Sequence, residues 1–463
     1  MRAGIVGLVV FGAALTACSS DDAAKPSAVA GGWAPGTVYL TARETTDRGW
    51  LDRRGLIHAH SVHSHDACDG QPKDDAGVVN SPCLDDFRRG LCATRHDFVM
   101  LTDHNDSFGS TEYPDALLYD ASRGDVLLER GGAPVANRLA CPEGDPPLVL
   151  AGTESGLMPV GIERHVASTP AERGAVYGAE TAEAIEKLKA LGAVVLVQHT
   201  EKWTAQQLSD LPIDGFEMYN LHANLFIGAG PALGLIADLK EPELLPHPDL
   251  VMLPIVSEDK RYLERWGTVL ASGKKRVTTM GTDCHQNVFK DLLPDGERID
   301  SYRRMMGWFS NHLLVKPNAE GSFGDLELKE ALGAGRLYGA FEVLGFPLGF
   351  DFHAETPSGI AEMGSEVAAA DGPKLVAKLP RVQSLDASAK RPDFVVRLLR
   401  AKSGGWDVVK ETAEDLSFVA SEPGAYRVEI RMKPRHLEKH LSSYVDLAEK
   451  DFAWVYSNAL YVK

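Results

Sequence analysis

The stretch Asp97-Phe-Val-Met-Leu-Thr102 is a nearly continuous apolar run, and the polar pair Asp103-His104 follows it directly. A run without polar alternation is typical of a strand covered on both faces, as in a parallel sheet. Three further runs share this character: Leu148-Val-Leu-Ala-Gly152, Ala193-Val-Val-Leu-Val197 and Arg276-Val-Thr-Thr-Met280. Helix-like stretches lie between them, and the clearest is Thr181–Leu191, which Gly192 closes. This alternation of strand and helix predicts an α/β fold built as a (β/α) barrel or a relative of it.

Outward from this core, the chain of 463 residues divides into four regions. We expect a signal segment at 1–17, a tether and lead-in at 18–50, the barrel at 51–345 and a β-rich region at 346–463. In the last region Tyr426, Val428 and Ile430 alternate with Arg427, Glu429 and Arg431. Such alternation indicates a half-buried antiparallel strand, and the region therefore predicts a small all-β sandwich.

The N-terminus carries the features of an export signal. Arg2 is basic, and Ile5–Leu15 is apolar but too short to span a bilayer as a permanent helix. Leu15-Thr16-Ala17-Cys18 resembles a bacterial lipobox, and a polar tract follows it. We expect a membrane-anchored lipoprotein on the periplasmic face or the cell surface, with lipidated Cys18. The alternative is an ordinary signal peptide.

Charge and cysteine usage narrow the partners and the chemistry. The formal net charge is −17, whereas nucleic-acid binders are more often basic, so no nucleic-acid partner is expected. No Cys-x-x-Cys occurs, which argues against a thiolate zinc site. Because export permits disulfides, we expect two of them among four cysteines, in any of three pairings, with Cys284 free. The four cysteines are Cys68, Cys83, Cys92 and Cys141.

Ligand-type side chains follow nearly every apolar run. His58 and His60 are two residues apart, so on a strand both rings point to one face. The later runs and their neighbours supply His104, Glu154, His165, His199 and the pair Asp283 and His285. Parallel barrels build their active sites at the C-terminal strand ends, so these residues predict one multinuclear metal site.

Each of these residues also has a plainer interpretation. His165 can cap a loop, His199 can be a core histidine, and we expect Asp103 to be a turn or capping residue. The remaining histidines lack a position at a strand end, so we leave them out of the site: His63, His96, His222, His247, His312, His353, His436 and His440.

At these motifs the chain resembles the PHP family, named for polymerase and histidinol phosphatase. The family's first motif, His-x-His-Ser-x-x-Ser-Asp, is similar to the stretch from His58 to His65, and Thr102-Asp103-His104 is similar to its second. Glu154 stands where the family has a metal-bridging glutamate, and the motifs span residues 52 to 345. The resemblance implies a distorted (β/α)₇ barrel, a TIM-like fold, followed here by the β region.

The resemblance also implies three metal positions. The first uses His58, His60, Glu154 and Asp283. The second shares Glu154 and adds His165 and His199. The third uses His104, His285 and either His65 or Asp66, and we favour His65 because its spacing from His58 matches the family's usual aspartate. Nitrogen and oxygen ligands without thiolate suit two or three Zn, Mn or Fe ions.

Such a site predicts a metal-dependent hydrolase that acts on a small-molecule or surface-exposed substrate. Bridged ions activate water and neutralise charge on the attacked group, which favours phosphoester hydrolysis. We expect Glu154 and Asp283 to be essential and Arg164 to clamp a phosphate, with Lys202 and Arg261 as lesser candidates. Two alternatives stay open. One is a carbamate or amide hydrolase, because a branch of PHP-like proteins with a C-terminal β domain resembles carbaryl-hydrolysing enzymes and this chain shares that layout. The other is a non-catalytic metal-holding surface module.

Overall fold

Parallel strands form the centre of the computed structural model, in which residues 33–38, 46, 48–227, 234, 235 and 237–463 are described. Their order across the sheet is β10 (Gly215–Asn220), β11 (Val277–Cys284), β1 (Leu51–Ala59), β2 (Phe98–Met100) and β6 (Leu148–Leu150). Phe98 and Met100 belong to one hydrophobic cluster, whereas Val99 belongs to another. The strands are therefore covered on both faces, as the continuous apolar runs predict.

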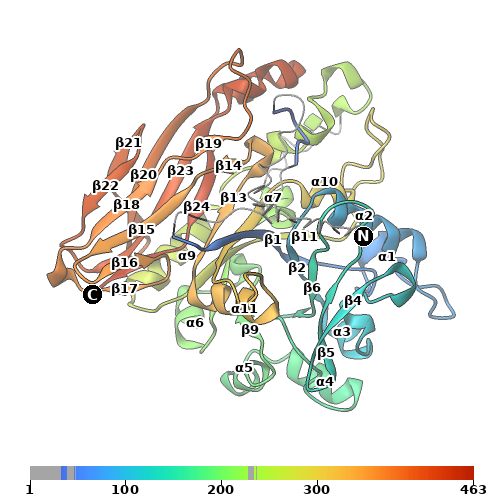
Figure 1. Ribbon diagram of the computed structural model, residues 1–463. Coiled ribbons are helices and arrows are strands. Elements are labelled where there is room, and N and C mark those ends of the chain that lie inside the picture. Colours follow the sequence, from blue (N-terminus) through green and yellow to red (C-terminus); the bar gives the residue numbers. More distant parts are fainter. Residues whose placement is uncertain (1–32, 39–45, 47, 228–233, 236) are drawn as a thin grey trace, which may run out of the picture. The chain divides into compact units, whose positions relative to one another are not determined.

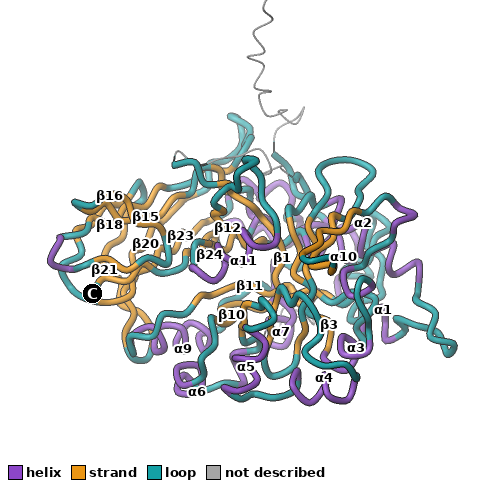
Figure 2. Tube along the Cα trace, turned by 60° about the horizontal axis from the view of Figure 1, so that its bottom comes forward, coloured by secondary structure: helices purple, strands orange, loops and turns teal. Residues whose placement is uncertain are grey.

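Helices follow the strands, and Figure 2 shows α3, α4, α5, α6 and α9 along one side of them. The predicted helix near residues 181–191 is α5, Ala182–Lys189, and the Thr181 side chain caps it by accepting a hydrogen bond from Ala184 N. Further α-helices with described bounds are α1 (Ala67–Gly70), α2 (Ser81–Ala93), α3 (Asn105–Ser110), α4 (Pro170–Tyr177), α6 (Ala205–Asp210), α7 (Leu221–Ile227), α9 (Lys260–Ala271), α10 (Tyr302–Met306) and α11 (Asp325–Ala334).

The parallel strands do not close into a barrel, so the structure is a mixed α/β fold with a large open sheet. Between β6 and β10 lie β8 (Met158–Val160) and β9 (Val194–Leu196), which form an antiparallel sheet of their own. Backbone contacts outside the named ladders join them to their neighbours: an isolated bridge links Gly152 to Val160. On the β10 side, Val197 N donates to Gly215 O, Asp214 N to Val195 O and Glu217 N to Val197 O. Pro159 has no N–H to offer a second neighbour, which limits pairing on that side. The prediction of a closed barrel is therefore not confirmed. The predicted strand at 193–197 is present as β9, which runs antiparallel to β8 and is hydrogen-bonded to β10 in the parallel pattern.

On the β11 side of β1, the N-terminal half of the strand continues into antiparallel strands. β12 (Ser310–Val315) pairs with β1, β13 (Leu337–Ala340) with β12, and β24 (Phe452–Ser457) with β13, so the C-terminal strands extend the main sheet. The other strands on this side of the sheet are β17 (Glu366–Val367), β20 (Asp393–Lys402), β21 (Gly405–Thr412), β23 (Gly424–Lys433) and β25 (Leu460–Val462). A separate four-stranded sheet holds β15 (Asp351–Thr356), β16 (Gly359–Glu362), β18 (Lys374–Lys378) and β22 (Leu416–Val419). Figure 1 shows the strands of the C-terminal region in orange and red. The domain boundary predicted at residue 345 stays a prediction.

Strand β23 differs from its prediction, because both of its faces are buried. The apolar side chains face the core, but Arg427, Glu429 and Arg431 are also nearly inaccessible to solvent. Arg427 pairs with Glu429, and Arg431 pairs with Glu258. Burial of these charges is tolerable because each has a partner of opposite charge.

The predicted disulfides are confirmed and their pairing is resolved. Cys68 bonds to Cys83, Cys92 bonds to Cys141, and Cys284 is free and buried. Both bonds fit an exported protein. Among the described residues, no helix is long and apolar enough to cross a membrane. The signal, Cys18 and most of the tether lie outside the described residues.

Candidate metal centre

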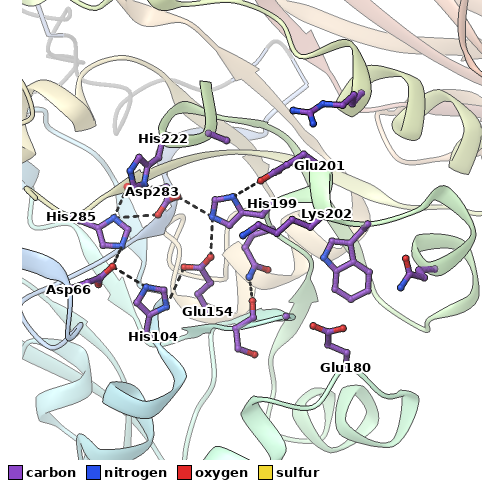
Figure 3. Close-up of a pocket in the computed structure, with 17 residues that line it drawn as sticks. Asp66, His104, Glu154, Glu180, His199, Glu201, Lys202, His222, Asp283 and His285 are labelled. Atoms are coloured by element: carbon purple, nitrogen blue, oxygen red, sulfur yellow. Dashed lines mark hydrogen bonds and ion pairs between the residues drawn. The ribbon is translucent and has the colours of Figure 1, made fainter. Parts of the chain in front are cut away.

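Ligand-type side chains meet where the parallel strands end (Figure 3). A first group consists of His58, Glu154, His199 and Asp283, and a second group consists of His60, Asp66, His104 and His285. In each group the ligand atoms lie within 4.8 Å of one another. A smaller third group, His222, Asp283 and His285, shares two of its members with the others.

Glu154 and Asp283 lie at the middle of the first group. The Nε2 atom of His58 is 3.3 Å from Glu154 Oε2 and 3.2 Å from Asp283 Oδ1. The Nε2 atom of His199 is 3.3 Å from Glu154 Oε1 and 3.2 Å from Asp283 Oδ2. His60 Nε2 lies 3.0 Å from Glu154 Oε2, so this carboxylate also reaches the second group.

Asp66 connects the second group. One of its oxygens, Oδ2, lies 3.2 Å from both His104 Nε2 and His285 Nε2. The other oxygen accepts a hydrogen bond from Ser64 Oγ, which orients the carboxylate. The structure therefore brings Asp66 into the site.

The histidines of the centre are oriented by contacts on their far nitrogens. His58 Nδ1 is 2.5 Å from Glu217 Oε1, His60 Nδ1 is 3.1 Å from Ser64 Oγ, and His199 Nδ1 is 3.2 Å from Glu201 Oε1. His285 Nδ1 is 2.9 Å from the carbonyl oxygen of Asp283. Metal-binding histidines characteristically donate their second N–H to such acceptors, which leaves the other nitrogen's lone pair for the metal.

Several buried atoms aimed at the centre have no hydrogen-bond partner among the described residues. They are His58 Nε2, His60 Nε2, His285 Nε2 and Asp283 Oδ1. Buried polar atoms rarely stay unsatisfied in proteins. Their convergence, together with an all nitrogen and oxygen donor set, fits divalent cations such as Zn, Mn or Fe.

The electrostatics of the centre favour bound positive charge. Burial alone lowers the pKa of His58, but Glu217, Asp283 and Glu154 more than reverse this and raise it well above its usual value. Burial also opposes the charge on His199, yet Asp283, Glu154 and Glu201 raise its pKa to about 12. The pKa of Glu154 lies well below its usual range, because His58 and His199 outweigh burial. The carboxylates therefore stay ionised, and without metal their charge is balanced by protonated histidines. Metal ions would displace these protons on binding.

The backbone turns sharply at three members of the first group. His58 has a φ of 80°, His199 of 47° and Asp283 of 53°. Non-glycine residues with positive φ are uncommon, and such strain clusters at functional sites. At His58 the pairing of β1 with β11 also shifts register between Ile57 and Ala59, which re-aims the side chain.

A glycine makes room for the support behind His58. A Cβ atom at Gly281 would lie 1.9 Å from Glu217 Oε1 and 3.0 Å from His58 Nδ1. Any larger residue at 281 would therefore displace the Glu217–His58 pair.

Three residues predicted for the site lie outside these groups. His165 Nε2 is 2.9 Å from Thr111 O, and its Nδ1 is 3.1 Å from Tyr177 Oη. Its strand β8 runs antiparallel to β9, so the end of β8 leaves the sheet away from the edge that carries His199. His65 is exposed and contacts Asp106, at 3.1 Å. Arg164 is exposed and does not line the cavity at the centre. The structure therefore places the predicted ligands His165 and His65 and the predicted clamp Arg164 outside the two groups and the cavity.

Asp103 behaves as the sequence suggests, because its carboxylate accepts hydrogen bonds from the backbone and hydroxyl of Ser61. His222, which was left out of the predicted site, has its Nδ1 3.4 Å from Asp283 Oδ2, and Glu217, which was not predicted, supports His58. Both come from β10 and its C-terminal end. His222 follows the end of a strand, which is the signal that identifies the other ligands. This strand, β10, is not recognised in the sequence because Glu217 and Asn220 interrupt its apolar pattern.

A cavity of about 740 Å³ opens onto the centre. Asp66, His104, Glu154, His199, Asp283 and His285 form its floor. Lys202, Trp203 and Arg261 contribute to the wall, and Figure 3 shows Lys202 beside His199. The cavity therefore joins candidate metal ligands to two cationic side chains.

Comparisons with known proteins add little to this geometry. No protein-family model matches the sequence, and no curated protein matches it. One solved structure is similar, a two-domain protein from Bacteroides vulgatus ATCC 8482 described as containing a predicted PHP-like metal-dependent phosphoesterase. The identity is 13% and the TM-score 0.32, over 92% of this chain and 100% of that one. A likeness this distant carries no weight for the function of this chain.

Proposed function

We propose that the protein is a metal-dependent hydrolase of the PHP kind that cleaves a phosphoester. One observation carries the proposal: two groups of four ligand residues lie side by side, and six of the eight line a cavity that Lys202 and Arg261 also line. Divalent ions held there would lower the pKa of a coordinated water and neutralise charge on the attacked group and its leaving oxygen.

The chain's own residues have distinct tasks in this proposal. Glu154 contacts histidines of both groups and would hold the two ions at a fixed spacing. Asp283 presents an unsatisfied buried oxygen to the same space. Lys202 and Arg261 line the cavity and would bind the substrate's anionic oxygens, which replaces the clamp predicted for Arg164.

The test is a substrate screen with purified, metal-loaded protein. We expect hydrolysis of phosphomonoesters or phosphodiesters that a chelator abolishes and Mn or Zn restores. Cleavage of aryl carbamates alone would instead support the carbamate and amide alternative. Tight metal binding without any hydrolysis would support a non-catalytic module.

We also propose that the chain is exported and anchored through lipidated Cys18. Two disulfides support export, although Cys18 itself lies outside the described residues. The test is detergent partitioning: the wild type should enter the detergent phase, and Cys18→Ala should stay in water or remain unprocessed.

A further inference from the structure

The C-terminal region, residues 346–463, supplies no residue to the metal centre. Its strands nevertheless pack against helix α9, which also contacts the segment after His199. The charged face of β23 is buried against α9. The guanidinium of Arg427 lies 4.3 Å from the ring centre of Trp266 on α9 and 4.5 Å from that of Trp406 on β21. Cation–π contacts of this kind are strongest when they are desolvated, as here.

Polar and steric contacts fix the position of α9 on these strands. Trp406 Nε1 donates to Leu263 O at 2.9 Å, and Gly404 N donates to Thr268 Oγ1 at 2.9 Å. A Cβ atom at Gly267 would lie 1.9 Å from Gly405 O, so helix and hairpin approach as closely as glycine allows. Helix α9 therefore has little freedom to shift relative to the C-terminal strands.

Other side chains of α9 hold the segment that carries His199, which we call the His199 loop (residues 199–204). Arg265 donates to the carbonyl oxygens of Trp203 and Glu201. The hydroxyl of Tyr262 donates to the Glu201 carboxylate. The other oxygen of Glu201 is 3.2 Å from His199 Nδ1, and Figure 3 shows this contact on the side of His199 away from Glu154.

We infer that the C-terminal strands are the fixed support of the first metal group, acting through α9, Tyr262 and Glu201 on the orientation of His199. Tyr262 is thus a positioning residue. The inference rests on the proposed metal centre. It assigns a task to a region that carries no ligand, and it predicts that only the ion of the first group depends on this chain of contacts.

Stepwise metal affinity of the full-length protein tests the first link. Tyr262→Phe keeps the buried ring and removes only the hydroxyl. Because outer contacts of ligand histidines are worth about 10- to 100-fold in metal affinity, we expect one of two bound Zn ions to be held about tenfold less tightly. It should be the same ion that His199→Ala loses, whereas the ion that His104→Ala loses should be unaffected.

Tyr444→Phe is the matched control, since its hydroxyl binds Asp238 away from the centre. It should leave both ions unchanged. If Tyr262→Phe binds both ions like the wild type, or weakens both equally, the inference is overturned. A wild type that binds no ion would contradict the proposed function as well.

A double-mutant cycle tests the second link. Trp406→Phe removes the hydrogen bond to Leu263 and keeps an aromatic ring beside Arg427. We expect it to weaken the same ion severalfold, and the double variant Trp406→Phe/Tyr262→Phe to be weakened by less than the product of the single effects. Independent, multiplying effects would mean that Trp406 does not act through Tyr262, and the C-terminal strands would lose this role.

Discussion

Two buried histidines have similar surroundings but different bonding: His312 of β12, which pairs with the N-terminal half of β1, and His58 near the C-terminal end of β1. Near Arg54, His312 is fully buried and uses both ring nitrogens: Nδ1 is 2.9 Å from Asp52 Oδ1, and Nε2 is 3.1 Å from Glu342 Oε1. At the other end, His58 is equally buried, but its Nε2 lies 3.2 Å from Asp283 Oδ1 and 3.3 Å from Glu154 Oε2 without a well-aligned hydrogen bond to either. Burial and acidic neighbours therefore do not separate a structural histidine from a candidate ligand, whereas the unsatisfied nitrogen does.

The same contrast extends to the electrostatics. Burial opposes the charge on both rings, and neighbouring carboxylates raise both pKa values above the usual one. For His312, Asp52 and Glu342 contact both ring nitrogens and balance its charge. For His58 the surplus of carboxylates leaves room for a further cation.

The largest effect should come from Glu154→Gln, which removes a charge shared by both groups. Outer contacts of ligands already cost about 10- to 100-fold in metal affinity or activity, so loss of this direct ligand should lower turnover at least about a hundredfold. Metal content should fall too. The measurements are kcat on the substrate found in the screen and metal analysis of the purified variant.

Glu180→Gln is the control, because Glu180 lines the cavity but belongs to none of the three groups. Unchanged metal content in Glu154→Gln would show that the assignment of the centre is wrong.

His312→Ala should do the opposite, with a large loss of stability and no loss of metal. Removing one partner of a buried charge pair costs about 3–5 kcal/mol, because the remaining charges stay buried without compensation. Denaturant unfolding of metal-free protein gives the free energy, and metal analysis gives the ion content. An ion lost without destabilisation would make His312 a ligand and remove the contrast.

The stabilisation from His312 should depend on pH. Its pKa lies at about 9 in the folded protein, since Asp52 and Glu342 outweigh burial, and near its usual value of about 6.5 in the unfolded chain. A raised folded pKa contributes stability that is complete below about pH 6.5 and is lost as the pH rises through about 9. The unfolding free-energy difference between wild type and His312→Ala should therefore shrink between pH 6 and 10, and a constant difference would contradict this.

Asp66 and His65 are adjacent in the sequence, but only Asp66 contacts the histidines of the second group. Asp66→Ala should remove about one ion or weaken it about 10- to 100-fold, because Asp66 contacts His104 and His285. His65→Ala should change little, since His65 is exposed and pairs with Asp106. Isothermal titration with Zn compares the two variants, and the reverse ranking would return the ligand role to His65.

The smallest effect should come from the cavity wall. Lys202→Ala should raise KM about tenfold, the size expected for loss of one hydrogen bond to a charged group. Arg164→Ala should leave KM unchanged, because Arg164 does not line the cavity. Equal effects of the two substitutions would place the anion site elsewhere.

The sequence predicts the strands that are apolar on both faces and the ligands that follow them. Runs ending before His104, Glu154 and Asp283 are visible because no charged or amide side chain interrupts them. Strand β10 was not visible, since Glu217 and Asn220 serve the site from within the strand and break the pattern.

Errors in the predicted site arise in turns, where the alternation of side chains along a strand no longer determines which way a side chain points. His65 and Asp66 lie in turns after β1, where a one-residue difference decides which side chain faces the centre. His165 follows β8, and its misplacement depends on β8 being antiparallel to β9, which no local pattern reveals. Closure of the sheet likewise depends on pairing between distant segments.

Anomalous diffraction from crystals grown with Zn or Mn would locate the ions of the proposed metal centre. We predict two peaks, one within about 2.0–2.2 Å of ligand atoms from His58, Glu154, His199 and Asp283, and one at the same range from His60, Asp66, His104 and His285. A map with no peak among these residues, or with peaks only elsewhere in the protein, would contradict the account.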